Sequence, residues 1–127
     1  MKCKWYYKIL LSCNIIMDDY IYKATIESIY DGDTITCTVD CGFGVKLTKQ
    51  KIRLFGINCP EMRGENKIKG KEARDALRNK LADKKIYLKT IKDKKGKYGR
   101  YLGIIYLGEE NINDWIVENG YGVKANY

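Results

Sequence analysis

Three short stretches, far apart in the chain, contain the residues best suited to chemistry. They are residues 31–34 (Asp-Gly-Asp-Thr), residues 53–61 (Arg-Leu-Phe-Gly-Ile-Asn-Cys-Pro-Glu) and residues 97–100 (Lys-Tyr-Gly-Arg). Carboxylate, amide and backbone oxygens are the ligands that calcium prefers. Forked guanidinium groups bind phosphate oxygens in pairs. Together these residue types favour metal-assisted attack on a phosphodiester.

The chain contains no histidine. This excludes histidine-based acid–base catalysis, histidine-ligated zinc and serine–histidine triads. Cys59 is a poor candidate for a thiol nucleophile, because no histidine is present to activate it. Any reaction must therefore use mainly carboxylate and guanidinium groups.

Length and charge limit the class of protein. The 127 residues are enough for one domain with a hydrophobic core. With 24 Lys and Arg against 16 Asp and Glu, the net charge is +8, which favours a polyanionic partner such as DNA or RNA. A lysine-rich interaction module with incidental charge is the alternative. Nothing in the sequence indicates a stable protein partner, and we expect a monomer.

The five cysteines have an odd count and irregular spacing. This pattern does not fit a disulfide framework, and too few ligands lie nearby for a zinc site. We therefore expect free thiols.

Residues 1–16 differ from the rest of the chain, which leaves residues 17–127 as the expected domain. Residues 1–16 contain three lysines, no acid and a short apolar run at residues 9–16. This run is too short to span a membrane and only weakly resembles a signal peptide or a lipoprotein box. Translation from Met17 is the interpretation we favour, with a cytoplasmic location. A functional signal would instead give a secreted or lipid-anchored protein.

Hydrophobic periodicity predicts a small strand-rich domain. Tyr22 to Tyr30 alternates, with Tyr22, Ala24, Ile26 and Tyr30 expected on one face. Further strands are expected at residues 34–40, 45–57, 86–91 and 101–107, and helices at residues 71–83 and 111–120. A phase slip near residues 49–51 indicates a bulge. This order predicts an α+β fold, a five-stranded OB-fold (Greek-key) β-barrel with two or three helices.

The chain resembles the staphylococcal nuclease (thermonuclease) family from about Tyr22 to Gly120. Each motif is weak alone, but their order and spacing together are specific. The resemblance rests on the Asp-Gly-Asp-Thr turn, Arg53 with Gly56-Ile57 and Pro60-Glu61, Gly70 with Glu72-Ala73, Tyr98-Gly99-Arg100, and Asn113 with Gly120.

The resemblance implies calcium-dependent cleavage of DNA and RNA phosphodiesters. By position it assigns catalysis to three residues: Arg53, Glu61 and Arg100. Glu61 would act as the general base, and the two arginines would neutralise the transition state. Neither arginine is convincing alone, since each is readily explained as a surface cation, and Glu61 alone could be a solvent-facing loop acid. Their occurrence together with Asp33 favours the functional interpretation.

The resemblance also implies a calcium site. Its ligands would be Asp33, Asn58 and the backbone carbonyl of Cys59. Asn58 stands where the family usually has a second aspartate, so the site is one charge short and weaker calcium binding is expected. A catalytically weakened OB domain that binds nucleic acid without cleaving it is therefore the alternative function.

Substrate binding is implied for Lys97 and Tyr98. The basic loop at residues 92–97 is either a solvated charge run or a track for a phosphate backbone, with Tyr98 stacking on a base. The chain ends soon after Gly120, where the family member used for comparison continues into a further tyrosine-containing segment and a helix.

Overall fold

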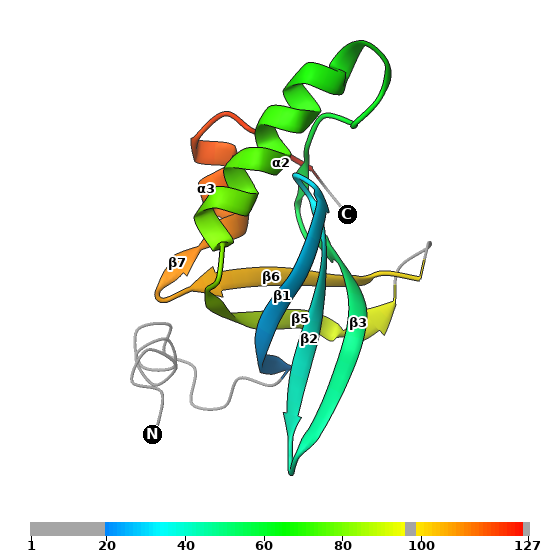
Figure 1. The fold of residues 1–127 in the computed structure, drawn as a ribbon, viewed down its shortest axis with the longest axis vertical. Coiled ribbons are helices and arrows are strands. Elements are labelled where there is room, and N and C mark those ends of the chain that lie inside the picture. Colours follow the sequence, from blue (N-terminus) through cyan, green and yellow to red (C-terminus); the bar gives the residue numbers. More distant parts are fainter. Residues whose placement is uncertain (1–19, 96–98, 126–127) are drawn as a thin grey trace.

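The computed structural model describes residues 20–95 and 99–125; the side chains of residues 92–95 lie outside this description. Strands form most of the fold (Figure 1). The strands are β1 (Ile21–Asp31), β2 (Thr34–Gly42), β3 (Val45–Leu54), β4 (Ile57–Asn58), β5 (Lys85–Lys95), β6 (Tyr101–Leu107), β7 (Glu110–Asn111) and β8 (Val123–Lys124). The helices are the 3-10 turn η1 (Gly64–Asn66), α2 (Lys67–Leu81) and α3 (Ile112–Glu118).

Five long strands close into a barrel. They follow the order β3-β2-β1-β5-β6, with antiparallel neighbours, and a parallel pairing of β3 with β6 closes the ring. In this closing pair Arg53 lies opposite Leu102, so β3 and the entry to β6 run side by side. The predicted five-stranded α+β barrel of the OB type is confirmed.

A bulge in β1 changes the predicted face of one residue. The β1–β2 register shifts between Ile26 and Ser28. Beyond this shift Ile29 points into the core and is 5% exposed, whereas Tyr30 is 69% exposed. The prediction that Tyr30 shares a face with Ala24 is therefore wrong, because an extra residue in one strand reverses the alternation that follows it.

The phase slip predicted in β3 is present. The β2–β3 register shifts between Cys37 and Val39, and Lys49 on the opposite strand has φ of 56°. Beyond it, Ile52 and Leu54 are buried and Arg53 points to the outer face. The slip therefore restores the alternation that places Arg53 outside the barrel.

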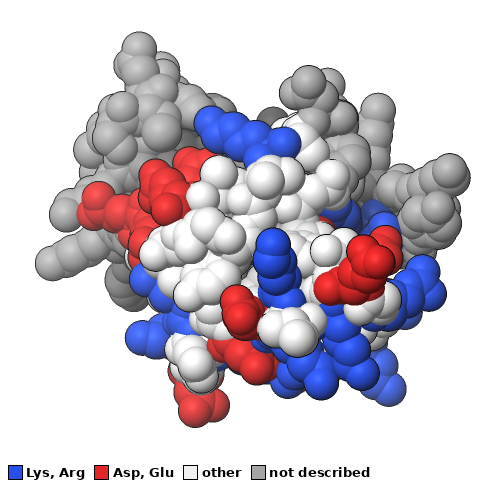
Figure 2. Space-filling model, turned by 90° about the horizontal axis from the view of Figure 1, so that it is seen from above, with Lys and Arg blue, Asp and Glu red and all other residues white. Residues whose placement is uncertain are grey.

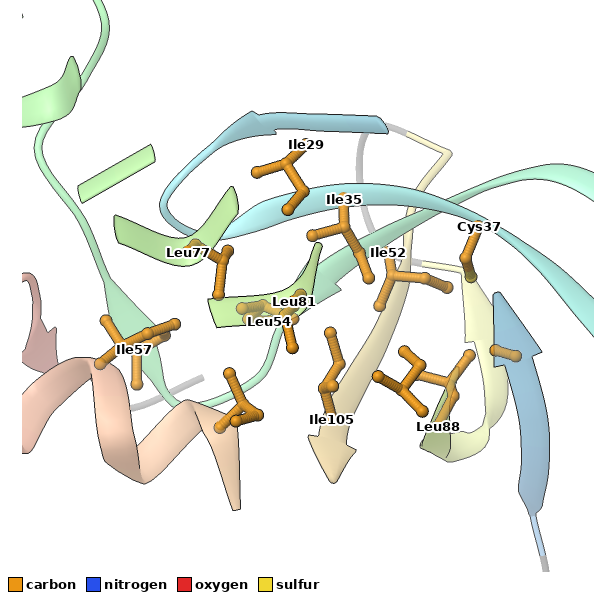
Figure 3. Packing of buried hydrophobic residues seen from close by; sticks show 14 of the residues in the cluster. Ile29, Ile35, Cys37, Ile52, Leu54, Ile57, Leu77, Leu81, Leu88 and Ile105 are labelled. Atoms are coloured by element: carbon orange, nitrogen blue, oxygen red, sulfur yellow. The ribbon is translucent and has the colours of Figure 1, made fainter. Parts of the chain in front are cut away.

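Helix α2 covers one end of the barrel. It begins four residues earlier than predicted and buries a stripe at helical spacing: Gly70, Ala73, Leu77 and Leu81. Leu77 and Leu81 are 0% and 1% exposed and pack toward Ile35 and Leu54 (Figure 3). This packing fixes the helix above the β1–β2 turn (Figure 1).

Helix α3 begins at its predicted cap. The side chain of Asn111 accepts a hydrogen bond of 3.1 Å from the Asp114 N–H, as an N-cap residue does. Asn113 is 3% exposed and donates to the carbonyls of Phe55 and Gly103. Buried Asn113 thus joins this helix to the residue that follows β3 and to the backbone of β6.

A second, two-stranded sheet was not predicted. The third strand was expected to run to Ile57, but β3 ends at Leu54 and Ile57–Asn58 forms β4. Strand β4 pairs with β8, with Asn58 opposite Val123, and the Ala125 N–H donates to the Gly56 carbonyl at 2.9 Å. The last described residues of the chain therefore hold the segment that contains Asn58.

Several predictions fall on residues that the structure does not describe. These are the extension at residues 1–16, Lys97 and Tyr98. Among the described residues, no helix is long and apolar enough to cross a membrane. Cys37, Cys41 and Cys59 are free thiols, as predicted for them.

Candidate functional site

Asp33 lies in the tight turn between β1 and β2, and its carboxylate points inward. The residue is only 7% exposed. Its Oδ2 accepts a hydrogen bond of 2.8 Å from the Cys59 N–H, and its Oδ1 accepts one of 3.3 Å from the Thr34 hydroxyl. Asp33 therefore links the first and second sequence motifs.

Arg53 lies beside Asp33 because β3 pairs with β2. Thr34 is directly opposite Arg53, and the Leu54 N–H donates to the Asp33 carbonyl at 2.8 Å. The Arg53 Nη2 is 3.4 Å from the Asp33 Oδ2 and donates to the Asn58 Oδ1 at 2.6 Å. The side chains of Arg53 and Asp33 are 12% and 11% exposed, so this ion pair is largely shielded from water.

Arg100 reaches the same cluster through Thr34. Its Nη1 donates to the Thr34 Oγ1 at 3.2 Å, and that hydroxyl donates to Asp33. The position of Arg100 follows from barrel closure, since β6 begins at Tyr101 opposite Ile52. Both arginines assigned from the sequence are thus brought to one carboxylate.

The segment around Cys59 is held by close backbone packing. A Cβ on Gly32 would lie 2.8 Å from the Cys59 Sγ, and one on Gly122 would lie 2.8 Å from both that sulfur and the Asn58 carbonyl oxygen. Burial, followed by the charges of Asp33 and Asp31, raises the pKa of the Cys59 thiol to about 12. The thiol therefore stays protonated, which agrees with the expectation that it is no nucleophile.

Glu61 lies at the rim of the site and not at its centre. Its side chain is 72% exposed, and its Oε2 is 3.6 Å from the Arg63 Nε. Its backbone packs closely against α2, however, because a Cβ on Gly70 would lie 2.3 Å from the Glu61 carbonyl oxygen. The backbone of this residue thus packs against the helix while its carboxylate faces solvent.

Asp31 belongs to the site although sequence reasoning assigned it only to the turn. Its Oδ1 accepts a hydrogen bond of 3.0 Å from the Asp33 N–H. Burial, then the neighbouring charge of Asp33, raises the pKa of Asp31 to about 6. The sequence signal that could have revealed this role of Asp31 is the presence of two acids, Asp31 and Asp33, two residues apart in one turn.

The donor atoms fit a hard cation. Asp33 and Asn58 offer side-chain oxygens, both of which contact one Arg53 nitrogen, so the structure already places a positive group between them. Oxygen ligands of this kind suit calcium. Among the described residues, no group of three or more Asp, Glu, Cys or His side chains is arranged to hold a metal ion, and of the two proposed side-chain ligands only Asp33 is an acid.

Replacing Asp31 with Asn should stabilise the metal-free protein near neutral pH. The folded-state pKa of about 6 lies above the ordinary 3.8, so this group favours folding below pH 3.8 and that contribution is lost as the pH rises through 6. We expect Asp31→Asn to raise Tm at pH 7.5 in EDTA by about 4 °C, after allowing for partial solvent screening, and by much less at pH 4.5.

Thermal melts of the variant and the parent at both pH values test this expectation. Glu72→Gln, at an exposed position of α2, is the matched control. An equal Tm change at the two pH values would show that the charge on Asp31 is not the cause.

A barrel of this topology, with a buried carboxylate and two arginines brought together at one end, is typical of an OB-fold domain of the nuclease-like class. The family model described as staphylococcal nuclease homologue matches residues 51–127, and the chain belongs to that family. The resemblance stated from the sequence is confirmed.

Three relatives give the scale of similarity. A thermonuclease of Staphylococcus hyicus is 33% identical over 106 residues, covering 81% of this chain and 58% of the relative. A thermonuclease of Staphylococcus intermedius is 29% identical over 98 residues, covering 75% of this chain and 55% of the relative. An uncharacterized protein of Bacillus anthracis is 33% identical over 107 residues, covering 81% and 47%. The chain thus spans about half the length of these relatives.

Proposed function

We propose that this chain is a calcium-dependent nuclease that hydrolyses phosphodiester bonds of DNA or RNA. The observation that supports it best is the convergence of Arg53 and Arg100 on Asp33, through a direct ion pair and through Thr34. Two forked cations beside one buried carboxylate suit a phosphate whose charge grows during reaction. Family membership supports the same reaction class.

The arginines would bind the non-bridging phosphate oxygens. Arg53 is held beside Asp33 by its hydrogen bonds to the Leu54 carbonyl and the Asn58 side chain. On calcium binding to Asp33 and Asn58, Arg53 Nη2 would be displaced from these oxygens, and the guanidinium would then donate to the phosphate as its charge grows. Calcium held by Asp33, Asn58 and the Cys59 carbonyl would supply the positive charge that polarises the phosphodiester.

Glu61 would accept a proton from the attacking water. Its ion pair with Arg63 is exposed on both sides and is worth little, so the carboxylate is available to turn toward the site. The Glu61 carbonyl packs closely against Gly70 of α2, so only the side chain would need to turn. The water would then attack phosphorus in line with the leaving oxygen.

Calcium removal and Glu61 substitution test the proposal. We expect the purified protein to degrade plasmid and single-stranded DNA with calcium present and not with EGTA, and the low site charge predicts a requirement for millimolar metal. Glu61→Ala should lower the rate by about 100-fold or more, as loss of a general base does. Arg63→Ala is the matched control, since it frees Glu61 without removing it.

The outcomes separate the two candidate functions. Absence of calcium-dependent cleavage at high metal, or full activity in Glu61→Ala, would contradict the nuclease. Salt-dependent binding of nucleic acid without cleavage would support the alternative, an OB domain that only binds.

A further inference from the structure

A groove of about 830 Å³ lies next to the candidate site, between the outer faces of β1, β2 and β3 and helix α2. It shares Asp31, Thr34 and Arg100 with the site and continues past them to residues without an assigned role. These further residues include Tyr30, Thr36, Lys51, Arg74 and Arg78. The groove is therefore an extension of the site rather than a separate cavity.

The groove is positively charged. Its lining contains four cations, Lys51, Arg74, Arg78 and Arg100, against one acid, Asp31. Figure 2 shows the molecule from above, where most of the visible Lys and Arg side chains lie along the lower and right edges of the view, with acidic side chains scattered among the rest. A hollow with this charge attracts a polyanion.

The two helical arginines line the groove. Arg74 and Arg78 are four residues apart on α2, so they project on the same side of the helix. Arg78 donates to the Ile29 carbonyl from Nη2 at 2.9 Å and from Nε at 3.3 Å, which ties it to the end of β1. Arg74 pairs with Asp75, whose side chain is 57% exposed, and such a pair restrains it only weakly.

Lys51 continues the line of cations along β3. Thr36 lies opposite Lys51 as Thr34 lies opposite Arg53, so both cations project from the same outer face. Two residues along a strand advance about 7 Å. The cations thus follow one another along the strand instead of crowding one point, which suits successive phosphates of a chain.

Tyr30 supplies an aromatic face at the edge of the groove. The β1 bulge turns this residue outward, leaving it 69% exposed. Exposed aromatic rings beside basic residues stack on unpaired bases with little regard to sequence.

We propose that this groove binds the stretch of a single-stranded polynucleotide that flanks the scissile phosphodiester. Lys51, Arg74 and Arg78 contact successive phosphates, and Tyr30 stacks on a base. The proposal rests on the proposed function, because it treats the Asp33 cluster as the point of cleavage. It makes a polynucleotide, and not a dinucleotide, the preferred substrate.

Binding without metal tests the groove independently of catalysis. A fluorescent oligothymidylate of about 12 nucleotides, within the span that one OB-fold covers, is titrated in EDTA at several salt concentrations. The triple variant Lys51→Gln, Arg74→Gln, Arg78→Gln should bind about tenfold or more weakly, and its log–log salt slope should be smaller by about 2. Tyr30→Ala should bind about tenfold more weakly, whereas Tyr30→Phe, which keeps the ring, should bind as the parent does.

Lys69→Gln is the matched control, since this exposed lysine of α2 does not line the groove. Circular dichroism melts show that each variant is folded. Parent-like affinity and salt slope in the folded triple variant would contradict the proposed role of the groove. Equal binding by Tyr30→Ala and Tyr30→Phe would contradict base stacking on Tyr30.

Cleavage with calcium separates this inference from the proposed function. The ratio of kcat/KM for the oligonucleotide to that for a dinucleotide should fall about tenfold in the triple variant and stay unchanged in Lys69→Gln. If the parent binds through the groove but cleaves neither substrate, the proposed groove is supported and the proposed nuclease activity is contradicted. If the parent cleaves both substrates and the kcat/KM ratio does not change in the triple variant, the nuclease activity is supported and the groove is contradicted.

Discussion

Arg53→Ala should lower kcat/KM for DNA by about 100- to 1,000-fold without weakening calcium binding. The activity loss follows from the removal of a forked cation that donates to the phosphate in the transition state. The calcium result follows from the contacts of the guanidinium, because Arg53 Nη2 touches both Asp33 Oδ2 and Asn58 Oδ1, two of the oxygens proposed to hold the metal. Without this competing cation, calcium should bind as tightly as in the parent or more so.

Initial rates on single-stranded DNA at saturating calcium, with calcium titration by calorimetry, measure the two effects. Arg53→Lys keeps the charge but loses the fork, so it should recover only part of the rate. Lys46→Ala, an exposed cation on the same strand, is the matched control and should leave both quantities unchanged. A rate loss that calcium restores fully at high concentration would mean that Arg53 acts on the metal site alone.

The barrel was predictable because its signals are local. Alternation along β2, the Asp31-Gly32 turn and the helical stripe at Ala73, Leu77 and Leu81 each depend on neighbouring residues. The outward turn of Tyr30 was not predictable in the same way, because the β1 bulge is set by pairing with another strand. The pairing of β4 with β8 was not predictable from local sequence either, because it joins two short segments that are far apart in the chain.

The candidate site was predicted only in part, because its residues are brought together by strand pairing and not by local sequence. Motif order placed Asp33, Arg53 and Arg100 together, and strand pairing explains why: Arg53 is opposite Thr34, and β6 closes on β3. Periodicity carries no information on side chains outside regular elements. The exposed carboxylate of Glu61 and the shared burial of Asp31 were therefore found only in three dimensions.

Gly70→Ala should destabilise the protein and also slow catalysis. In an open helical position this change gains about 1 kcal/mol, because alanine has the higher helix propensity. Here the new Cβ would lie 2.3 Å from the Glu61 carbonyl oxygen and 3.0 Å from the Pro60 carbonyl oxygen, so the helix or the loop must shift. We expect a net loss of about 2 kcal/mol, or roughly 8 °C in Tm.

Gly70→Ala should slow catalysis because the added methyl group displaces the backbone of Glu61. A shift of its backbone by about 1 Å can cost on the order of 100-fold in rate, measured below the melting transition. Ala76→Gly on the same helix is the matched control, since it should lower stability by about 1 kcal/mol through propensity yet leave the rate of the folded protein unchanged.

Combining Gly70→Ala with Glu61→Gln identifies the route by which the glycine acts. If Gly70 matters for catalysis only because it positions Glu61, the double variant should be no slower than Glu61→Gln alone, since a displaced residue without its carboxylate has no further activity to lose. Rate losses that multiply in the double variant would contradict this. They would mean that the shift reaches Asp33 through the Cys59 N–H, whose hydrogen bond of 2.8 Å joins the same segment to the buried carboxylate.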